Sequence, residues 1–237
     1  MGDPIPPDRR FVLLLTYDCG EHWERQLGQP MQADPKGESI FAASNSSLAL
    51  DGRFARSFIT GGQAGPRVRT IWVGPGDTNT PAPPIGVLGT ARFVSRGWQT
   101  ETLPVVKRGE SAGAFSFGRH DQYAVIVGGD YKEPEGTQDT AWFLAVHQKW
   151  QPAQTLPHGY RSSVAYDAAT KTWITVGPNG TDISNDDGKN WRPLKPSAQD
   201  EKDADQNWNA LSLPFVAGPK GRIGKLNPTA LETPPTK

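Results

Sequence analysis

One eight-residue pattern occurs twice in this sequence and constrains its fold more than any other feature. It reads Ser or Thr, any residue, Asp, any residue, Gly, any two residues, Trp, and it covers residues 16–23 (TYDCGEHW) and 184–191 (SNDDGKNW). At ordinary residue frequencies a window matches by chance on the order of once in 10⁴, so two copies indicate an internal repeat. The copies, here called the first and second octapeptides, start 168 residues apart. That interval equals four units of about 42 residues, a length typical of a four-stranded β-unit.

The residue types of the octapeptide suit a tight turn held against a β-sheet core. The hydroxyl and carboxylate side chains can accept hydrogen bonds from the turn backbone, and Gly permits a positive φ. The Trp offers a large apolar surface by which the turn packs onto the core. We therefore expect a structural and not a catalytic role for Thr16, Asp18, Gly20, Trp23, Ser184, Asp186, Gly188 and Trp191.

The rest of the chain has the pattern of short β-strands. Apolar runs bounded by Gly, Pro, Asn or Asp occur at residues 11–15, 54–60, 68–73, 123–127, 141–146, 162–166 and 172–176. No window shows the sustained spacing of an amphipathic helix. The 26 Gly and 22 Pro stay below the level of a low-complexity chain, and eight Trp provide core material. The sequence predicts an all-β protein.

Charge and composition exclude several classes of partner and cofactor. The 25 Lys and Arg balance 25 Asp and Glu, which argues against a nucleic-acid partner reached by bulk electrostatics. No apolar run approaches 18 residues, so we expect no membrane insertion. A single cysteine, Cys19, and four scattered histidines give no metal-ligand spacing, and no nucleotide-binding glycine motif follows a strand. We expect neither a metal nor another cofactor.

The octapeptides resemble the Asp-boxes, or bacterial neuraminidase repeats, of sialidase-superfamily β-propellers. The repeating units also resemble those of bacterial propellers related to photosystem II stability and assembly factors. This resemblance is most specific at residues 37–44 (GESIFAAS), 127–131 (VGGDY) and 159–191, and it covers about residues 1–228. It implies a β-propeller of four-stranded antiparallel blades, with seven blades in the parent ring.

The resemblance also divides the chain into units. They are a partial blade at 1–29, blades at 30–108, 109–157, 158–197 and 198–228, and a disordered tail at 229–237. This implies an N-terminally truncated member with four to five blades, whose open edges allow self-association. The Pro-rich stretch 74–85 is predicted to interrupt the third strand of the second unit. Residues 1–7 lack a signal-peptide pattern, although the resemblance implies an exported, periplasmic or extracellular parent protein.

Two functions stay open at this stage. The first is a non-catalytic scaffold that binds a protein or glycan partner, as an assembly factor does. The alternative is an exo-acting glycoside hydrolase of the sialidase superfamily, which needs three clustered arginines, a Tyr–Glu pair and an acidic group. The Arg-Ile-Pro signature that usually opens sialidases is absent from this chain. We therefore expect a binding protein and not an enzyme.

Five residues are the best candidates for ligand binding. Glu38 and Asp130 lie near the ends of predicted inner strands, where carboxylates can face a channel. Tyr131, Tyr160 and Arg161 combine the aromatic and guanidinium groups that are enriched at recognition surfaces. The competing interpretations are solvated loop acids for the carboxylates and packing between blades for Tyr160.

Overall fold

The structure is a computed structural model that describes residues 2–16, 18–25, 32–41, 45–51, 55–75, 93–145 and 148–231. It is all-β, as predicted from the sequence. All strand pairs in these residues are antiparallel, and the helical elements among them are two short 3₁₀ turns, η1 (Pro219–Gly221) and η2 (Pro228–Leu231). In this part of the chain no helix has the length and hydropathy needed to cross a membrane.

The strands form five successive groups, here called sheets 1 to 5. Sheet 1 comprises β1 (Gly2–Ile5) paired with β2 (Arg10–Val12), and β3 (Leu14–Leu15) paired with β4 (Glu24–Arg25). Sheet 2 contains β5 (Leu48–Asp51), β6 (Ala55–Thr60), β7 (Arg67–Pro75) and β8 (Phe93–Thr102). Sheet 3 contains β9 (Ala112–His120), β10 (Tyr123–Asp130), β11 (Ala141–Leu144) and β12 (Gln151–Pro152). Sheet 4 contains β13 (Ser163–Asp167), β14 (Thr172–Gly177), β15 (Gly180–Ser184) and β16 (Arg192–Leu194). Sheet 5 contains β17 (Ala210–Ser212), β18 (Phe215–Ala217) and β19 (Ile223–Lys225).

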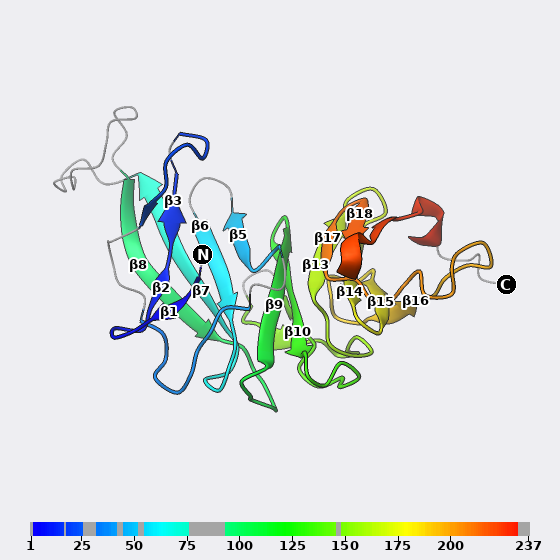
Figure 1. Ribbon diagram of the computed structural model, residues 1–237, viewed down its shortest axis with the longest axis horizontal. Coiled ribbons are helices and arrows are strands. Elements are labelled where there is room, and N and C mark those ends of the chain that lie inside the picture. The colour runs from blue at the N-terminus through cyan, green and yellow to red at the C-terminus, as the bar shows by residue number, and fades with distance from the viewer. Residues whose placement is uncertain are drawn as a thin grey trace.

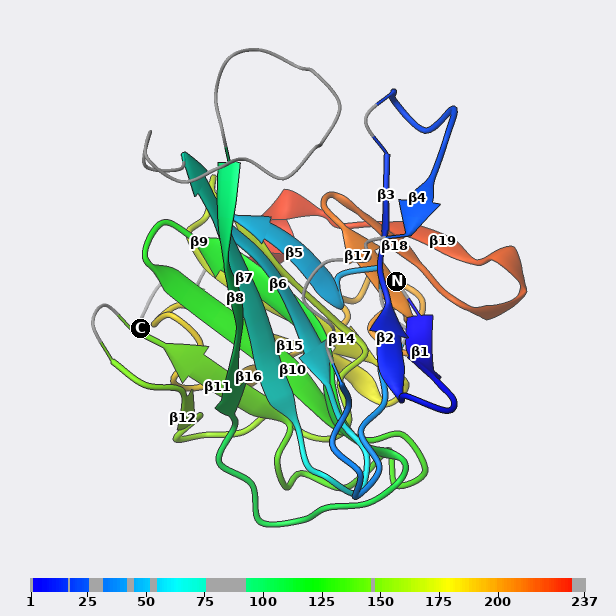
Figure 2. The same cartoon turned by 90° about the vertical axis from the view of Figure 1, so that its left-hand side faces the viewer.

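Within sheets 2 to 5 the strands lie in chain order, so each of these sheets is a meander of hairpins, whereas sheet 1 consists of two separate hairpins. Sheets 2, 3 and 4 follow one another across the long axis of the molecule in Figure 1, and Figure 2 looks along this row from the side of sheet 2. The protein is therefore a row of sheets packed face to face.

The core lies between neighbouring sheets, because side chains alternate between the two faces of a strand. In β10, Ile126 packs with Ile59 of sheet 2, whereas its neighbour Val125 packs with Val164 and Trp173 of sheet 4. This burial on both faces explains why β10 reads as an unbroken apolar run and not as an alternating pattern. Smaller clusters join sheet 1 to sheet 2 and sheet 4 to sheet 5.

Polar side chains join the segment that leads into β5 to the first strands of sheets 3 to 5. The Ser46 and Ser116 hydroxyls lie 2.5 Å apart, and Ser116 Oγ also accepts a hydrogen bond from the backbone of β13 at 2.8 Å. The Ser163 hydroxyl donates to Asn45 Oδ1 at 3.4 Å and accepts from the backbone of Leu211 at 3.2 Å. Asn45 Nδ2 also donates to the Leu211 carbonyl at 3.3 Å. Segments 166 residues apart in sequence are thereby brought into direct contact.

The second octapeptide forms a turn held by its own side chains. Ser184 Oγ accepts from the N–H of Gly188 at 3.0 Å, and Asp186 Oδ1 accepts from the N–H of Asn190 at 2.9 Å. The indole of Trp191 donates to the Gly188 carbonyl at 3.0 Å. The fourth and fifth residues of the octapeptide, Asp187 and Gly188, have positive φ angles of 62° and 80°. The pattern therefore encodes one specific backbone conformation.

The first octapeptide forms the same turn. Thr16 Oγ1 accepts from the N–H of Gly20 at 2.9 Å, Asp18 Oδ1 accepts from the N–H of His22 at 2.9 Å, and the Trp23 indole donates to the Gly20 carbonyl at 3.1 Å. Cys19, at the position of Asp187, also has a positive φ of 58°.

The two Trp side chains differ in burial. Trp191 is 3% exposed and belongs to the core between sheets 3 and 4. Gly188 is tightly packed in the same place, because a Cβ atom added to it would lie 2.5 Å from the Val125 side chain. Trp23 is 60% exposed, so the expectation that it packs onto a core is wrong. The physical reason is that no earlier sheet lies in the described part of the chain for the first turn to rest on.

Two further expectations need correction. The Pro-rich stretch does not interrupt the third strand, because β7 runs unbroken from Arg67 to Pro75 and pairs with β8 on the far side of the insertion. Residues 76–92 of the insertion lie outside the described residues. The tail does not begin at residue 229, because η2 continues to Leu231, whose side chain is buried in the core beside sheets 4 and 5. Residues 232–237 lie outside the described residues.

The two octapeptides provide a matched pair of variants. Trp191→Ala removes a fully packed indole and should lower the free energy of unfolding by about 3–5 kcal/mol. Trp23→Ala removes an exposed indole and should lower it by less than about 1 kcal/mol. Urea denaturation of the two variants and the parent protein measures both effects, and equal losses would contradict the inferred packing.

Candidate functional site

The five candidate ligand residues all lie near one end of sheets 2 to 4. At this end the second strand of each sheet stops and the first strand begins, and we call it the polar end. Asp130 is the last residue of β10, and Tyr131 follows it. Tyr160 and Arg161 precede β13 and are hydrogen-bonded through their backbone N–H groups to Pro134 and Gly128. Glu38 lies beside Ser39, which bridges to the residue after β6.

Tyr131 and Tyr160 belong to one aromatic cluster. Both rings meet Phe115 edge to face, with ring centroids 6.2 Å and 4.8 Å away, and Phe41 stacks on Phe115 at 4.4 Å. Tyr160 is buried, and this burial raises the pKa of its phenol. Tyr131 is 47% exposed. The structure thus brings the two tyrosines together, as packing partners of Phe115, and presents one of them to solvent.

Glu38 does not face an open channel. Its carboxylate is buried and accepts from Arg69 Nε at 2.8 Å, Arg69 Nη2 at 2.6 Å and Arg67 Nη1 at 3.1 Å. The Thr60 hydroxyl and the Asp34 backbone N–H each add a bond at 2.8 Å. Both oxygens are therefore used inside the protein, and the expectation of a ligand-facing carboxylate is wrong for this residue.

The surroundings of Glu38 act on its pKa in opposite directions. Burial alone raises the pKa of this carboxyl, because it disfavours the charged form. Hydrogen bonds from Arg69, from the Asp34 backbone and from Thr60, together with the positive charge of Arg69, outweigh that effect. The pKa of Glu38 is held below its ordinary value, so the carboxylate is ionised at neutral pH.

Arg161 is also buried and fully engaged. Its Nε and Nη2 both donate to Asp182 Oδ2, the first at 2.8 Å, and its Nη1 donates to Asn179 Oδ1 at 2.6 Å and to the Tyr160 carbonyl at 2.8 Å. His158 Nδ1 lies 2.8 Å from Asp182 Oδ1 and 2.9 Å from Arg161 Nη2. Burial lowers the pKa of the guanidinium, and Asp182 opposes that change. Arg161 holds the end of sheet 4 together, and the expectation that it contacts a ligand is wrong.

Asp130 lies in a more open group of charges around Lys107. The Lys107 ammonium is 2.6 Å from Glu133 Oε2 and 3.5 Å from Asp130 Oδ2. Burial acts to raise the pKa of Asp130, but the Ser111 hydroxyl, the Lys132 backbone and Lys107 together lower it. The hydrogen bond from Lys107 to Glu133 raises the pKa of Lys107. Asp130 adjoins Tyr131 in sequence. Its side chain is 13% exposed, whereas those of Lys107 and Glu133 are more accessible to solvent.

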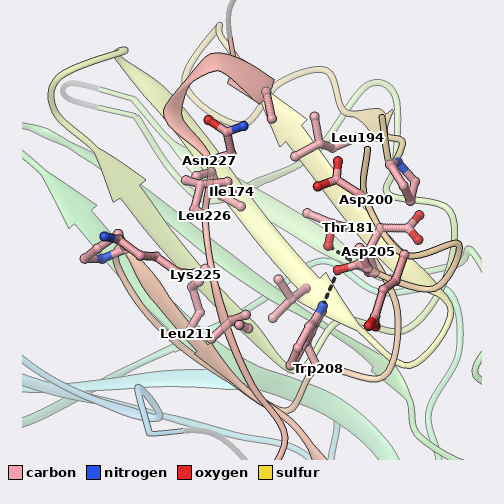
Figure 3. A pocket seen from close by; sticks show the side chains of 18 of the residues that line it. Ile174, Thr181, Leu194, Asp200, Asp205, Trp208, Leu211, Lys225, Leu226 and Asn227 are labelled. Atoms are coloured by element: carbon pink, nitrogen blue, oxygen red, sulfur yellow. Dashed lines mark hydrogen bonds between the residues drawn. The ribbon is translucent and has the colours of Figure 1, made fainter. Parts of the chain in front are cut away.

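A cavity of about 450 Å³ lies between sheets 4 and 5 (Figure 3). Among the described residues sheet 5 has three strands against four in sheet 4, so no fourth strand of sheet 5 lies opposite sheet 4 in this part of the chain. Ile174 and Leu194 line one side, Leu211 lines the other, and Trp208 donates its indole N–H to the Ala204 carbonyl at 2.9 Å. Asp205 also lines the cavity, and its Oδ1 is buried without a hydrogen-bond partner among the described residues. The cavity shares no lining residue with the aromatic cluster.

One group of possible metal ligands occurs among the described residues, and it belongs to the first octapeptide. Asp18, Glu21 and His22 place one ligand atom each within 4.8 Å of one another. The His22 backbone N–H and the Thr16 hydroxyl lower the pKa of Asp18 to about 2. Turn formation alone explains why these three residues lie together, because the corresponding bonds recur in the second octapeptide.

Sequence reasoning missed the partners of the buried charges. The sequence does indicate that Arg67 and Arg69 act together, because alternate residues of one strand point to the same face. Asp182 is indicated as well, because it is the one charged residue in the segment Gly180–Ser184 that forms β15. Nothing in the sequence alone pairs these residues with Glu38 or Arg161, which lie about 20–30 positions away in the chain.

No family model, curated protein or solved structure matches this chain.

The buried Arg161–Asp182 pair should contribute far more to stability than an exposed one. Asp182→Asn leaves the buried guanidinium without its counter-ion, and the free energy of unfolding should fall by about 3–5 kcal/mol. Asp203→Asn is the matched control, because Asp203 pairs with Arg222 at 3.1 Å on the surface and should contribute less than about 1 kcal/mol. Chemical denaturation of both variants tests this, and a small loss for Asp182→Asn would refute the assignment.

Glu38 should make stability depend on pH in the acidic range. Because its pKa is lower in the folded than in the unfolded protein, its contribution is complete above the unfolded pKa and is lost as the pH falls through the folded pKa. In Glu38→Gln this contribution is absent at every pH. Unfolding free energies measured from pH 7 down to pH 3 should therefore fall more steeply in the parent protein than in the variant. Parallel curves would contradict the proposed role of Glu38.

Proposed function

We propose that this protein is a non-catalytic β-propeller of the Asp-box type, a scaffold that binds a protein or glycan partner at its polar end. Three observations support the propeller. The sheets are successive antiparallel meanders, their first strands meet through the Asn45–Ser163–Leu211 contacts, and two octapeptide turns have the same hydrogen bonds. Radially packed four-stranded sheets are the defining unit of that architecture.

The observation that carries the binding role is the contrast between buried and exposed groups at the polar end. The two buried charges there are paired within the protein. Glu38 pairs with Arg67 and Arg69, and Arg161 pairs with Asp182. Tyr131, Lys107 and Glu133, in contrast, are accessible to solvent. An exposed tyrosine on a rigid aromatic base, beside charges of both signs, is typical of a recognition surface.

The same contrast favours a scaffold over a glycoside hydrolase. A glycosidase needs two carboxylates about 5–10 Å apart in a cleft, one of them free to donate or accept a proton. A sialidase also needs arginines whose guanidinium groups are free to bind the substrate carboxylate. Here Glu38 has both oxygens occupied, and Arg67, Arg69 and Arg161 are bonded to carboxylates of the protein itself.

We expect Tyr131 to be the main contact with the partner. Tyr131→Ala should weaken binding at least tenfold, because interface tyrosines commonly contribute more than 1.4 kcal/mol. The measurement combines a glycan array with photo-crosslinking from a benzoylphenylalanine placed at position 131 in cells. Tyr123, at the other end of β10, is the matched position for both the alanine variant and the crosslinker.

Activity measurements distinguish the two classes. Fluorogenic sialosides and a panel of nitrophenyl glycosides should show no turnover that depends on Glu38 or Asp130. Turnover abolished by Glu38→Gln or Asp130→Asn, in variants that still melt cooperatively, would overturn the scaffold proposal. Equal crosslinking from positions 123 and 131, together with unchanged array binding by Tyr131→Ala, would show that the polar end is not the binding surface.

A further inference from the structure

The cavity between sheets 4 and 5 lies apart from the polar end, and none of the five candidate ligand residues lines it. Its volume of about 450 Å³ falls within the roughly 300–1,000 Å³ that is typical of small-molecule sites. Strands of both sheets form its sides, and residues 195–205 and 226–230 contribute further side chains to the wall (Figure 3). The size of the cavity therefore suits a small molecule.

The buried part of the wall is mostly apolar. Ile174 and Val176 of β14 and Leu211 of β17 belong to the core between the two sheets and also line the cavity. Trp208 lines it too, and Gly224 leaves room for the indole, because a Cβ at that position would lie 3.0 Å from the ring. Apolar carbon placed against these side chains is removed from water, which is favourable. The wall therefore selects a ligand with an aromatic or aliphatic body.

Asp205 is the one buried ionisable residue of this wall. It is 8% exposed, and its Oδ1 has no hydrogen-bond partner among the described residues. Leaving a buried carboxylate oxygen without a donor is unfavourable, because the protein does not replace the hydrogen bonds that the oxygen makes with water. A ligand that carries a hydrogen-bond donor supplies the missing bond.

The two arginines that the structure relates to Asp205 are engaged elsewhere. Arg222 lines the cavity, but its Nη1 pairs with Asp203 at 3.1 Å. The charge of Asp205 also acts on Arg161, but the Nε of Arg161 donates to Asp182 at 2.8 Å. No ion pair joins Asp205 to either arginine in the described part of the chain. The carboxylate is therefore left for a cation from outside the protein.

Hydrogen bonds hold the backbone around Asp205. The Thr181 hydroxyl donates to the Asp205 carbonyl at 2.8 Å, and the Ser162 hydroxyl donates to the Trp208 carbonyl at 2.8 Å. These bonds tie residues 205–208 to sheet 4. The terminal torsion of an aspartate side chain is soft, so the unpartnered oxygen can turn toward a donor in the cavity while the backbone stays in place.

The exposed charges at the cavity have both signs. Lys195 and Lys225 line it together with Asp200 and Glu201, and all four residues are exposed. Water and salt screen such charges, so together they give little preference for a cation or an anion. The buried carboxylate of Asp205 is screened least, and it therefore decides the charge of the ligand.

We propose that this cavity binds a small organic amine with an aromatic or aliphatic body. The ammonium group of the ligand donates to the Asp205 carboxylate, and the body packs against Trp208 and Leu211. A hydrogen bond between charged groups is stronger than one between neutral groups, so an amine binds more tightly than an alcohol of the same shape. The cavity shares no lining residue with the aromatic cluster around Phe115, so the inference does not rest on the proposed scaffold function.

Three probes that share a phenyl body and differ in their head group test the proposal on the full chain. Phenethylamine, phenethyl alcohol and phenylacetate carry a positive, a neutral and a negative group at pH 7. Titrations followed by NMR at the indole N–H of Trp208, assigned with Trp208→Phe, give the dissociation constant of each probe. The amine should bind the parent protein at least tenfold more tightly than the other two probes.

Three variants separate the carboxylate from the cavity itself. Asp205→Asn keeps the shape of the side chain and removes its charge, so the affinity for the amine should fall at least tenfold and that for the alcohol should change less than about threefold. Leu194→Trp adds bulk to the wall and should abolish binding of all three probes. Glu201→Gln is the matched control, because it neutralises an exposed carboxylate of the same cavity and should change the amine affinity less than about twofold.

Circular dichroism melts establish that each variant folds, and Asp205→Ser replaces Asp205→Asn if that variant has lost its thermal transition. A parent protein that binds none of the probes would overturn the proposal. So would an alcohol or a carboxylate that binds as tightly as the amine, or an amine affinity that stays unchanged in Asp205→Asn or in Leu194→Trp. Loss of amine binding in Glu201→Gln would assign the selectivity to the exposed charges and would overturn it too.

Discussion

Each middle sheet of this protein is apolar on both faces, so its burial depends on a neighbour on either side. In β10 the consecutive residues Val125 and Ile126 belong to two different cores, one shared with sheet 4 and one with sheet 2. Because the hydrophobic contribution scales with apolar area removed from water, removing either neighbour would expose half of such a sheet. The same dependence leaves Trp23 and Ile223 exposed at the two ends of the row, where one neighbour is missing among the described residues.

Packing sheets face to face also buries charge where their strands end. Glu38 and Arg161 lie at those ends with almost no exposure, and each has counter-ions and hydrogen-bond partners for its polar atoms. Such pairs add little net stability compared with apolar residues of the same volume, but losing one partner is costly. They tie neighbouring segments together, Glu38 to β7 through Arg69 and Arg161 to β15 through Asp182.

Sequence reasoning was most successful where the interactions are local. The octapeptide hydrogen bonds join residues no more than four positions apart, so the residue types alone predict them. Tyr131 and Tyr160 were identified by type and position, and the structure brings both onto Phe115. The sequence assigns Glu38 and Arg161 to ligand binding, whereas inside the protein both are bonded to partners on strands that only folding brings near.

The sequence by itself determined the all-β class and the conformation of both octapeptide turns, since these follow from side-chain periodicity and short-range hydrogen bonding. Only the tertiary structure decided that Trp191 is buried while Trp23 is exposed, although both have the same local contacts. It also decided that Glu38 meets Arg69 and that Asn45 meets Leu211. Burial and long-range pairing depend on which sheet lies alongside, and that is a property of the whole fold and not of any eight-residue segment.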